Sequence, residues 1–325
     1  MPLKERHSHC LKLAALLLLL SVLTGCATTT NGRHAATTRL SPESTGLAAK
    51  GTSRLWQSQM QELDQLSLPE LEHQGDLALK RKDFHVAFVH YERVLRQAPD
   101  NVEVQFKLGL LFVLAGMDRE AIPYLEKVLQ AEPQRARAHY VLGLAHFHLQ
   151  ERQQAQDELQ LAIEYNPKLW QAHNLLGILA DTAKRADQAI ASFQAAIVLR
   201  PRNGQLHNNL GVAYAMAGAP KQAIHCFKQA LQNGYDPPRV YNNLGLALAG
   251  QGQFEEALAS FTKAGGAAKA YNNLGCAYLQ IGRTKEAKAC FQKALELEPE
   301  FYAVAQANHN KADVEITRGY KTAAP

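Results

Sequence analysis

A short motif recurs at a fixed interval along this chain and constrains its architecture. Tyr241-Asn242-Asn243-Leu244-Gly245 returns as Tyr271-Asn272-Asn273-Leu274-Gly275, and weaker copies end at Gly177 and Gly211. The motif glycines fall 34 residues apart over most of the chain, at Gly75, Gly109, Gly143, Gly177, Gly211 and Gly245. A fixed period of about 20 to 50 residues indicates a row of similar structural units rather than one globular core.

Other positions keep the same period. An alanine follows each glycine by 12 residues, and a large side chain follows the alanine by four: Tyr91, Leu125, Leu159, Phe193, Phe227 and Phe261. Small residues let two helices cross closely, and the large side chain fills the space beside the crossing. Glycines between the paired segments suit a left-handed helix end: Gly116, Gly218, Gly252 and Gly282. Prolines end most units, because proline cannot continue a helix: Pro99, Pro133, Pro167, Pro201 and Pro299.

This pattern resembles the tetratricopeptide repeat (TPR), from Ser67 to about Pro299. The resemblance implies an all-α fold, a TPR solenoid forming a right-handed superhelix. About seven helix-turn-helix repeats occupy 67–301, followed by a C-terminal capping helix at 302–318 and a disordered tail at 319–325. One helical pair cannot bury its apolar face alone, so stacked pairs share a continuous core.

Repeats one and six depart most from the pattern. Repeat one has Lys82 in place of the turn glycine, although Ser67 and Glu70 fit a capping box at its start. Repeat six is four residues short, because only 30 residues separate Gly245 from Gly275. The missing residues fall at 264–268. We therefore expect a shortened second helix in repeat six and an altered stacking angle between repeats six and seven.

The amino-terminal segment is predicted to direct the chain to a membrane. Residues 1–25 combine basic residues with a short apolar stretch, as in a signal peptide. Leu23-Thr24-Gly25-Cys26 looks like a bacterial lipobox, which implies a lipid on Cys26. Ala27 after the cysteine favours the periplasmic face of the outer membrane, by family analogy. The alternative is an ordinary signal peptide with a chance cysteine.

The next two segments lead into the repeats. Residues 26–54 are rich in Thr, Ala, Gly and Ser, without periodicity, and predict a flexible tether. Residues 55–66 carry apolar side chains at helical spacing and predict a short N-terminal capping helix. In the alternative reading, Trp56 and Met60 of this helix occupy the groove and regulate it.

Several classes of chemistry find no support in the sequence. The net charge of +5 is dispersed without a basic stripe, so we expect no nucleic-acid partner. No phosphate-binding loop, HExxH motif or nucleophile elbow occurs, and we expect neither enzyme activity nor a cofactor. His139, His173 and His207 share one repeat position, which predicts a packing ladder rather than a metal site. If residues 1–25 are removed, three cysteines remain beside Cys26, and Cys276–Cys290 is the nearest candidate disulfide.

The TPR resemblance implies a concave groove lined by the first helix of each repeat. Repeats two and three place apolar side chains there, and repeats four to seven place asparagines. An asparagine amide both donates and accepts, so this row suits the main chain of an extended peptide, and the apolar half suits an amphipathic helix. The alternatives are inter-repeat packing by the asparagines and burial of the apolar half by helix 55–66. The candidate groove residues are Asn174, Asn208, Asn209, Asn242, Asn243, Asn272, Asn273, Phe106, Leu110, Tyr140, Leu144 and Phe147.

The last third of the chain narrows the expected function. Residues 241–248, the short sixth repeat and residues 270–275 together resemble the TPR lipoproteins of tight-adherence (Flp) pilus systems, the TadD type. This implies a membrane-anchored scaffold that binds a protein or peptide partner during pilus and secretin assembly. Pilotin-like lipoproteins of type IV pili are a neighbouring possibility. The alternative from another class is a regulator that docks a peptidoglycan synthase or hydrolase.

Overall fold

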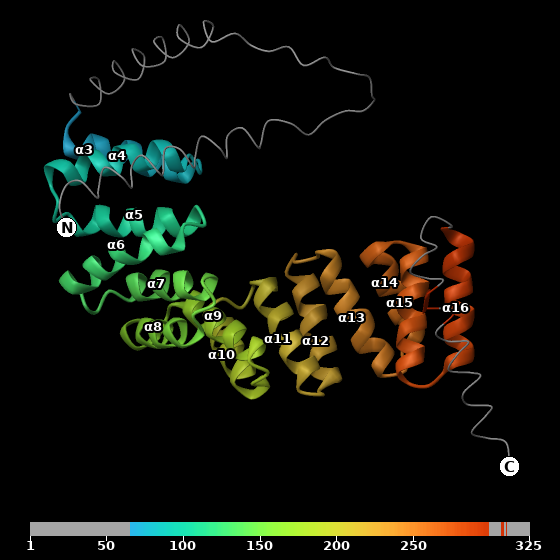
Figure 1. Cartoon of the computed structure of the whole chain (residues 1–325). Helices are drawn as coiled ribbons and strands as arrows, with labels where there is room; N and C mark the ends of the chain where they lie inside the picture. Colours follow the sequence, from blue (N-terminus) through green and yellow to red (C-terminus); the bar gives the residue numbers. More distant parts are fainter. Residues whose placement is uncertain (1–65, 299–306, 309, 311–325) are drawn as a thin grey trace, which may run out of the picture. The chain divides into compact units, whose positions relative to one another are not determined.

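The computed structural model describes residues 66–298 together with 307, 308 and 310. All regular structure in these residues is α-helical (Figure 1). Contacts divide the chain into two compact units, residues 1–128 and 129–325, and each is described by itself. The helices are α3 (Leu68–Lys80), α4 (Phe84–Gln97), α5 (Val102–Leu114), α6 (Asp118–Ala131), α7 (Ala136–His148), α8 (Arg152–Tyr165), α9 (Trp170–Thr182), α10 (Ala186–Leu199), α11 (Gly204–Met216), α12 (Pro220–Gln232), α13 (Pro238–Gly250), α14 (Phe254–Gly265), α15 (Ala267–Gln280) and α16 (Thr284–Leu297).

Consecutive helices form the pairs that the period predicts. In the second unit α7 packs on α8, α9 on α10, α11 on α12, α13 on α14, and α15 on α16. Each second helix then packs on the first helix of the next repeat, as α10 does on α11 and α14 on α15. Within the described residues this arrangement confirms an all-α TPR solenoid.

Close helix crossings explain the periodic glycines. A Cβ atom added to Gly211 would lie 2.6 Å from Cε1 of Phe227, and one added to Gly245 would lie 2.6 Å from Phe261. Both phenylalanine side chains are almost fully buried. Only glycine therefore fits where a first helix crosses the ring of its own second helix, as the sequence predicted.

The turns inside the repeats share one backbone conformation. The four predicted turn glycines have φ between 69° and 77°, which confirms their left-handed geometry. Lys82, Gln150 and Lys184 occupy the same repeat position with φ of 61°, 64° and 58°. The turn thus keeps its shape without glycine. In these three residues the left-handed backbone brings the Cβ atom close to the following carbonyl oxygen, which costs free energy.

The sixth repeat absorbs its missing residues mainly in a link. Helix α14 has 12 residues where α10 has 14, which confirms the predicted shortening. Between α14 and α15 stands Gly266 alone, whereas residues 200–203 separate α10 from α11. Gly266 has φ 85° and ψ 172°, a conformation open essentially only to glycine. The altered stacking angle stays a prediction.

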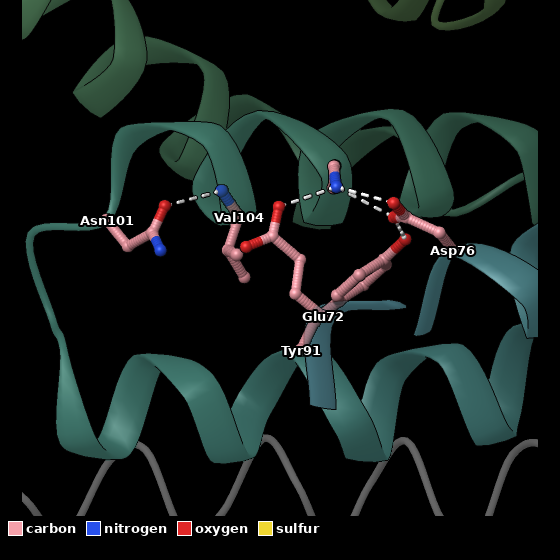
Figure 2. A network of polar contacts seen from close by, with 6 residues as sticks. Glu72, Asp76, Tyr91, Asn101 and Val104 are labelled. Carbon is pink, nitrogen blue, oxygen red and sulfur yellow. Dashed lines mark hydrogen bonds and ion pairs between the residues drawn. The ribbon is translucent and has the colours of Figure 1, made fainter. Parts of the chain in front are cut away.

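The first unit contains a part-buried polar network (Figure 2). Nζ of Lys107 on α5 donates to Glu72 at 2.7 Å and to Asp76 at 2.8 Å, both on α3. Tyr91 of α4 donates to Asp76 at 2.7 Å. Burial disfavours the Lys107 charge, but hydrogen bonds to Asp76 and Glu72 outweigh it and raise the pKa of the ammonium group. Three helices are thereby joined around one cation.

The start of α3 also follows the sequence prediction. The backbone N–H of Ser67 donates to Oε2 of Glu70 at 2.9 Å, and its hydroxyl donates to the same oxygen at 2.7 Å. Pro69 lies in the first turn, where its missing N–H leaves no bond unmade.

Several predictions fall outside the described residues. They are the signal peptide at 1–25 with the Cys26 site, the tether at 26–54, the helix at 55–66 apart from residue 66, and the tail at 319–325. The capping helix at 302–318 is described only at residues 307, 308 and 310, which are helical. None of the described helices is long and apolar enough to cross a bilayer.

Candidate functional site

The predicted asparagines lie on the first helices of repeats four to seven, all in the second unit. We call the surface that carries them the asparagine face; its members are Asn174 on α9, Asn208 and Asn209 on α11, Asn242 and Asn243 on α13, and Asn272 and Asn273 on α15. Residues four or seven positions apart share one side of a helix. The face therefore also includes Asp181, Met216 and Leu246, which follow Asn174, Asn209 and Asn242 at these spacings.

Side-chain amides connect neighbouring repeats across this face. Nδ2 of Asn209 donates to Oδ1 of Asn174 at 3.1 Å, and Nδ2 of Asn273 donates to Oδ1 of Asn242 at 2.9 Å. Asn308 makes the equivalent bond of 2.8 Å to Oδ1 of Asn272. The asparagines thus form a hydrogen-bonded ladder between repeats, the packing role that the sequence left open as an alternative.

Burial separates the asparagines into two groups. Asn208 and Asn272 are 4% and 6% exposed. Asn174, Asn242 and Asn243 are half-buried and keep part of their surface open to a partner. A role for the row in binding a peptide stays a prediction.

The apolar candidates divide between the two units. Phe106 and Leu110 lie on α5 in the first unit, where Phe106 is 4% exposed and Leu110 is half-buried. Tyr140, Leu144 and Phe147 lie on α7 in the second unit and pack, partly buried, against a core cluster that runs from Ala155 to Leu179. Burial raises the pKa of Tyr140. Burial of these apolar side chains by the predicted helix at 55–66 stays a prediction, because the structure does not describe residues 55–65.

Sequence reasoning missed two exposed apolar side chains on the asparagine face. Met216 is 48% exposed and Leu246 is 43% exposed. Leu246 occupies the same repeat position as Leu110 and Leu144, so applying the groove pattern of repeats two and three to repeat six would have found it. An apolar group beside a half-buried amide suits a peptide better than either group alone.

The histidine ladder has a specific structural role. Nε2 of His139, His173 and His207 lies 2.8, 2.9 and 2.8 Å from the carbonyl oxygen of the proline six residues earlier. Gln105, at the same repeat position, donates to the Pro99 carbonyl at 2.7 Å. This side chain therefore ties the first helix of repeats two to five to the link before it, which is a packing role.

His139 differs from the other two histidines by a second partner. Its Nδ1 lies 2.6 Å from Oε2 of Glu158, and its side chain is 8% exposed. Burial disfavours the charged ring, but the hydrogen bonds to Glu158 and to the Pro133 carbonyl outweigh it and raise the pKa of His139. With both ring nitrogens donating, the imidazolium form is the one that fits.

A pocket of about 860 Å³ opens on the other side of α11. Its apolar lining includes Ile197, Leu210 and Cys226, and burial raises the pKa of the Cys226 thiol to about 11. No disulfide joins Cys226, Cys276 and Cys290, so the candidate Cys276–Cys290 bond is not formed. Across the part of the chain that the structure describes, no group of three metal-ligating side chains comes together.

Within the described residues, the fold defines a helical-repeat protein. Sequence models of the tetratricopeptide repeat match residues 113–177, 175–224, 209–271 and 268–301. These matches run continuously over more than half of the chain, and none describes a catalytic domain. The chain belongs to the tetratricopeptide repeat family.

Solved structures of other repeat proteins are similar to this chain. A crystal structure of MamA is 32% identical, covering 51% of this chain and 91% of MamA with a TM-score of 0.46. The pilF protein of Pseudomonas aeruginosa is 20% identical over 66% of this chain and 97% of its own, with a TM-score of 0.51. YrrB, described as a TPR protein with an unusual peptide-binding site, is 20% identical over 56% and 96%, with a TM-score of 0.48. No curated protein matches the chain by sequence.

Proposed function

We propose that this protein is a membrane-anchored scaffold lipoprotein whose asparagine face binds a protein partner in the bacterial cell envelope. The observation that carries this proposal is the pair of exposed apolar side chains, Met216 and Leu246, on the same face as half-buried Asn242 and Asn243. Such a surface offers apolar contacts together with amide groups that can pair with a peptide main chain. Membership of a family of protein-binding repeats supports it.

The anchor and the envelope system are further parts of the proposal. The lipobox at 23–26 supports a lipid on Cys26 and a place at the periplasmic face of the outer membrane. The motif copies at 241–248 and 270–275, with the short sixth repeat between them, support pilus and secretin assembly as the system served.

Partner capture by matched variants tests the proposal. The full chain is crosslinked in its native envelope and purified in detergent, and its partners are identified by mass spectrometry. Met216→Ser combined with Leu246→Ser should abolish recovery of the partner, because the proposed apolar contacts with it are lost. Both side chains are exposed, so we expect the variant to fold normally. Val198→Ser on α10, which removes a side chain that is 80% exposed on another helix, is the control.

The identity of the captured protein decides the system. A secretin or pilus subunit that is lost in the double variant supports the proposal. A peptidoglycan synthase or hydrolase with the same dependence would assign the face to cell-wall regulation instead. Equal recovery by the wild type and the double variant would remove the asparagine face from the proposal.

A further inference from the structure

Two buried oxygen atoms of the second unit lack a hydrogen-bond partner among the described residues. They are Oδ1 of Asp181 and Oδ1 of Asn208. Both belong to the asparagine face, Asp181 on α9 and Asn208 on the adjacent helix α11. Folded proteins satisfy the large majority of buried polar atoms. Two unpaired acceptors on one face of neighbouring helices therefore indicate that donors are supplied from outside.

Asn208 differs from the asparagines at the same position of other repeats. Oδ1 of Asn174 and of Asn242 accepts a hydrogen bond from an asparagine on the first helix of the next repeat. Oδ1 of Asn272 accepts one from Asn308, which follows the last repeat. The equivalent donor for Asn208 is Asn243 of repeat six, and the two are not hydrogen-bonded. Asn208 is also only 4% exposed. The ladder is thus open at the junction of repeats five and six.

Asp181 is a carboxylate in an unfavourable place. It lies in the last turn of α9, where the free carbonyl groups of the helix repel negative charge. Burial raises the pKa of Asp181, and no cation of the described residues pairs with it. Repeats three, five, six and seven have Phe147, Ala215, Ala249 and Leu279 at this position, so the acid is peculiar to repeat four. The side chain keeps part of its surface exposed, and a cation can reach it.

We infer that the partner segment bound on the asparagine face carries a lysine or arginine whose cation pairs with Asp181, and that a main-chain N–H a few residues away in the same segment donates to Asn208. This inference rests on the proposed function and names the chemistry of its ligand. Ammonium and guanidinium groups only donate hydrogen bonds, which matches an unpaired carboxylate. Because Oδ1 of Asn208 is buried, binding includes an outward rotation of that side chain.

The spacing of the two acceptors sets the spacing in the ligand. Asp181 follows Asn174 by seven residues, or about 10 Å along the axis of α9. Asn174 is joined to Asn209, the neighbour of Asn208, by a hydrogen bond of 3.1 Å. An extended chain advances about 3.3 Å per residue. The basic residue is therefore at least about three positions from the residue that donates to Asn208.

Peptide binding with a single varied charge tests the inference. The probe is a library of ten-residue, otherwise apolar and neutral peptides in which one position is Lys, Arg, Gln or Glu, titrated against the full chain in detergent. Lys and Arg peptides should bind at least tenfold more tightly than their Gln counterparts. Asp181→Asn, which keeps the shape of the side chain, should remove this preference, and Asp181→Lys should transfer it to the Glu peptides. Asp187→Asn, at an exposed acid on α10, should leave it unchanged.

The possible outcomes separate this inference from the proposed function. Peptides that bind equally well with Lys, Gln and Glu would overturn the inference and leave the asparagine face as a binding site. A preference for Lys that survives in Asp181→Asn would overturn it as well. If no peptide binds, the inference fails, whereas the proposed function is decided by partner capture with the Met216 and Leu246 variants. Thermal unfolding of each variant confirms that it is folded.

Discussion

The side chain of Asn273 donates a hydrogen bond of 2.9 Å to Oδ1 of Asn242, across the junction of the sixth and seventh repeats. The recurring Asn-Asn-Leu-Gly motif therefore has two structural roles. Its glycine lets the two helices of one repeat cross, as Gly245 does beside Phe261. Its second asparagine reaches back to the previous repeat at Asn209 and Asn273, although not at Asn243. One short motif thus shapes the repeat and also joins it to its neighbour.

The Asn273–Asn242 bond should contribute measurably to stability. We expect Asn273→Ala to lower the free energy of unfolding by about 1 to 2 kcal/mol, because a part-buried amide oxygen on Asn242 loses its donor. Urea denaturation followed by circular dichroism measures the change. The double variant with Asn242→Ala should lose less than the two single losses combined, because both remove the same bond.

Asn243→Ala provides the matched control on α13. Asn243 is half-buried, and the described residues offer it no side-chain hydrogen bond. We expect this change to alter the free energy of unfolding by less than about 0.5 kcal/mol. A loss as large as that of Asn273→Ala would show that the ladder is not the source of the effect.

Two glycines of α13 should respond to alanine in opposite directions. A Cβ atom at Gly245 would lie 2.6 Å from Phe261, whereas one at Gly250 would meet no atom within 4 Å. Gly245→Ala should lower the free energy of unfolding by about 1 to 3 kcal/mol through overpacking. Gly250→Ala should raise it by about 0.5 to 1 kcal/mol, because alanine loses less backbone entropy in a helix. Thermal and urea unfolding of the pair would contradict this account if both changes had the same sign.

The positive-φ turns predict a stabilising substitution. Lys184 has φ of 58° at the repeat position where Gly218 has 69°. Lys184→Gly should raise the free energy of unfolding by about 1 kcal/mol, because it removes the strain of a Cβ atom in this conformation. The reciprocal change Gly218→Lys should lower it by a similar amount. Equal stability of Lys184→Gly and the wild type in urea titrations would mean that the lysine side chain offsets the strain.

Much of the fold was predictable from periodic residues. The glycine crossings and the shortened helix of repeat six follow from spacing, because both depend on local geometry that repeats with the chain. The left-handed turn at Lys82 shows that this geometry persists even where the residue that favours it is absent. Spacing placed the four-residue deletion of repeat six at 264–268 but assigned it to a shorter helix, whereas it falls mainly on the link at Gly266 rather than on α14.

The candidate site was predictable only in outline. The period placed Asn209 and Asn174 on one face, but their mutual hydrogen bond depends on side-chain rotamers and on the approach of two repeats. The unpaired oxygens of Asp181 and Asn208 could not be seen in the sequence, because an unmade contact leaves no pattern. Such details arise from packing between helices rather than from the order of residues along one of them.

The lipid anchor on Cys26 is testable independently of the repeats. Wild-type protein expressed in a diderm bacterium with an alkyne-labelled fatty acid should take up the label and fractionate with the outer membrane. Cys26→Ser should take up no label, because the acylated thiol is removed. It should also move to the soluble fraction, because no acyl chain remains to hold the protein in the membrane. Cys226→Ser is the control at a buried thiol of the repeats. Retained label in Cys26→Ser would refute the lipobox.

The pair of His139 and Glu158 predicts a specific pH dependence. Both ring nitrogens of His139 face acceptors, Oε2 of Glu158 at 2.6 Å and the Pro133 carbonyl at 2.8 Å. The pKa of His139 is raised in the folded state, so its stabilising effect is complete below the unfolded value of 6.5 and is lost as pH rises through the folded pKa. His139→Gln should cost about 1 kcal/mol more at pH 5.5 than at pH 8.5, a figure kept small because Glu158 is partly exposed.

Glutamine is the informative replacement for this histidine. Gln105 already makes the equivalent bond to the Pro99 carbonyl, so His139→Gln retains the donor to the Pro133 carbonyl and removes the charge together with the Nδ1 contact to Glu158. His173→Gln is the matched control, because His173 bonds the Pro167 carbonyl while Ser192 stands at the repeat position of Glu158. Urea midpoints of both variants across pH 5.5 to 8.5 should separate from the wild type in a pH-dependent way for His139 alone. Parallel curves for the two variants would show that the Glu158 contact adds no charge-dependent stability.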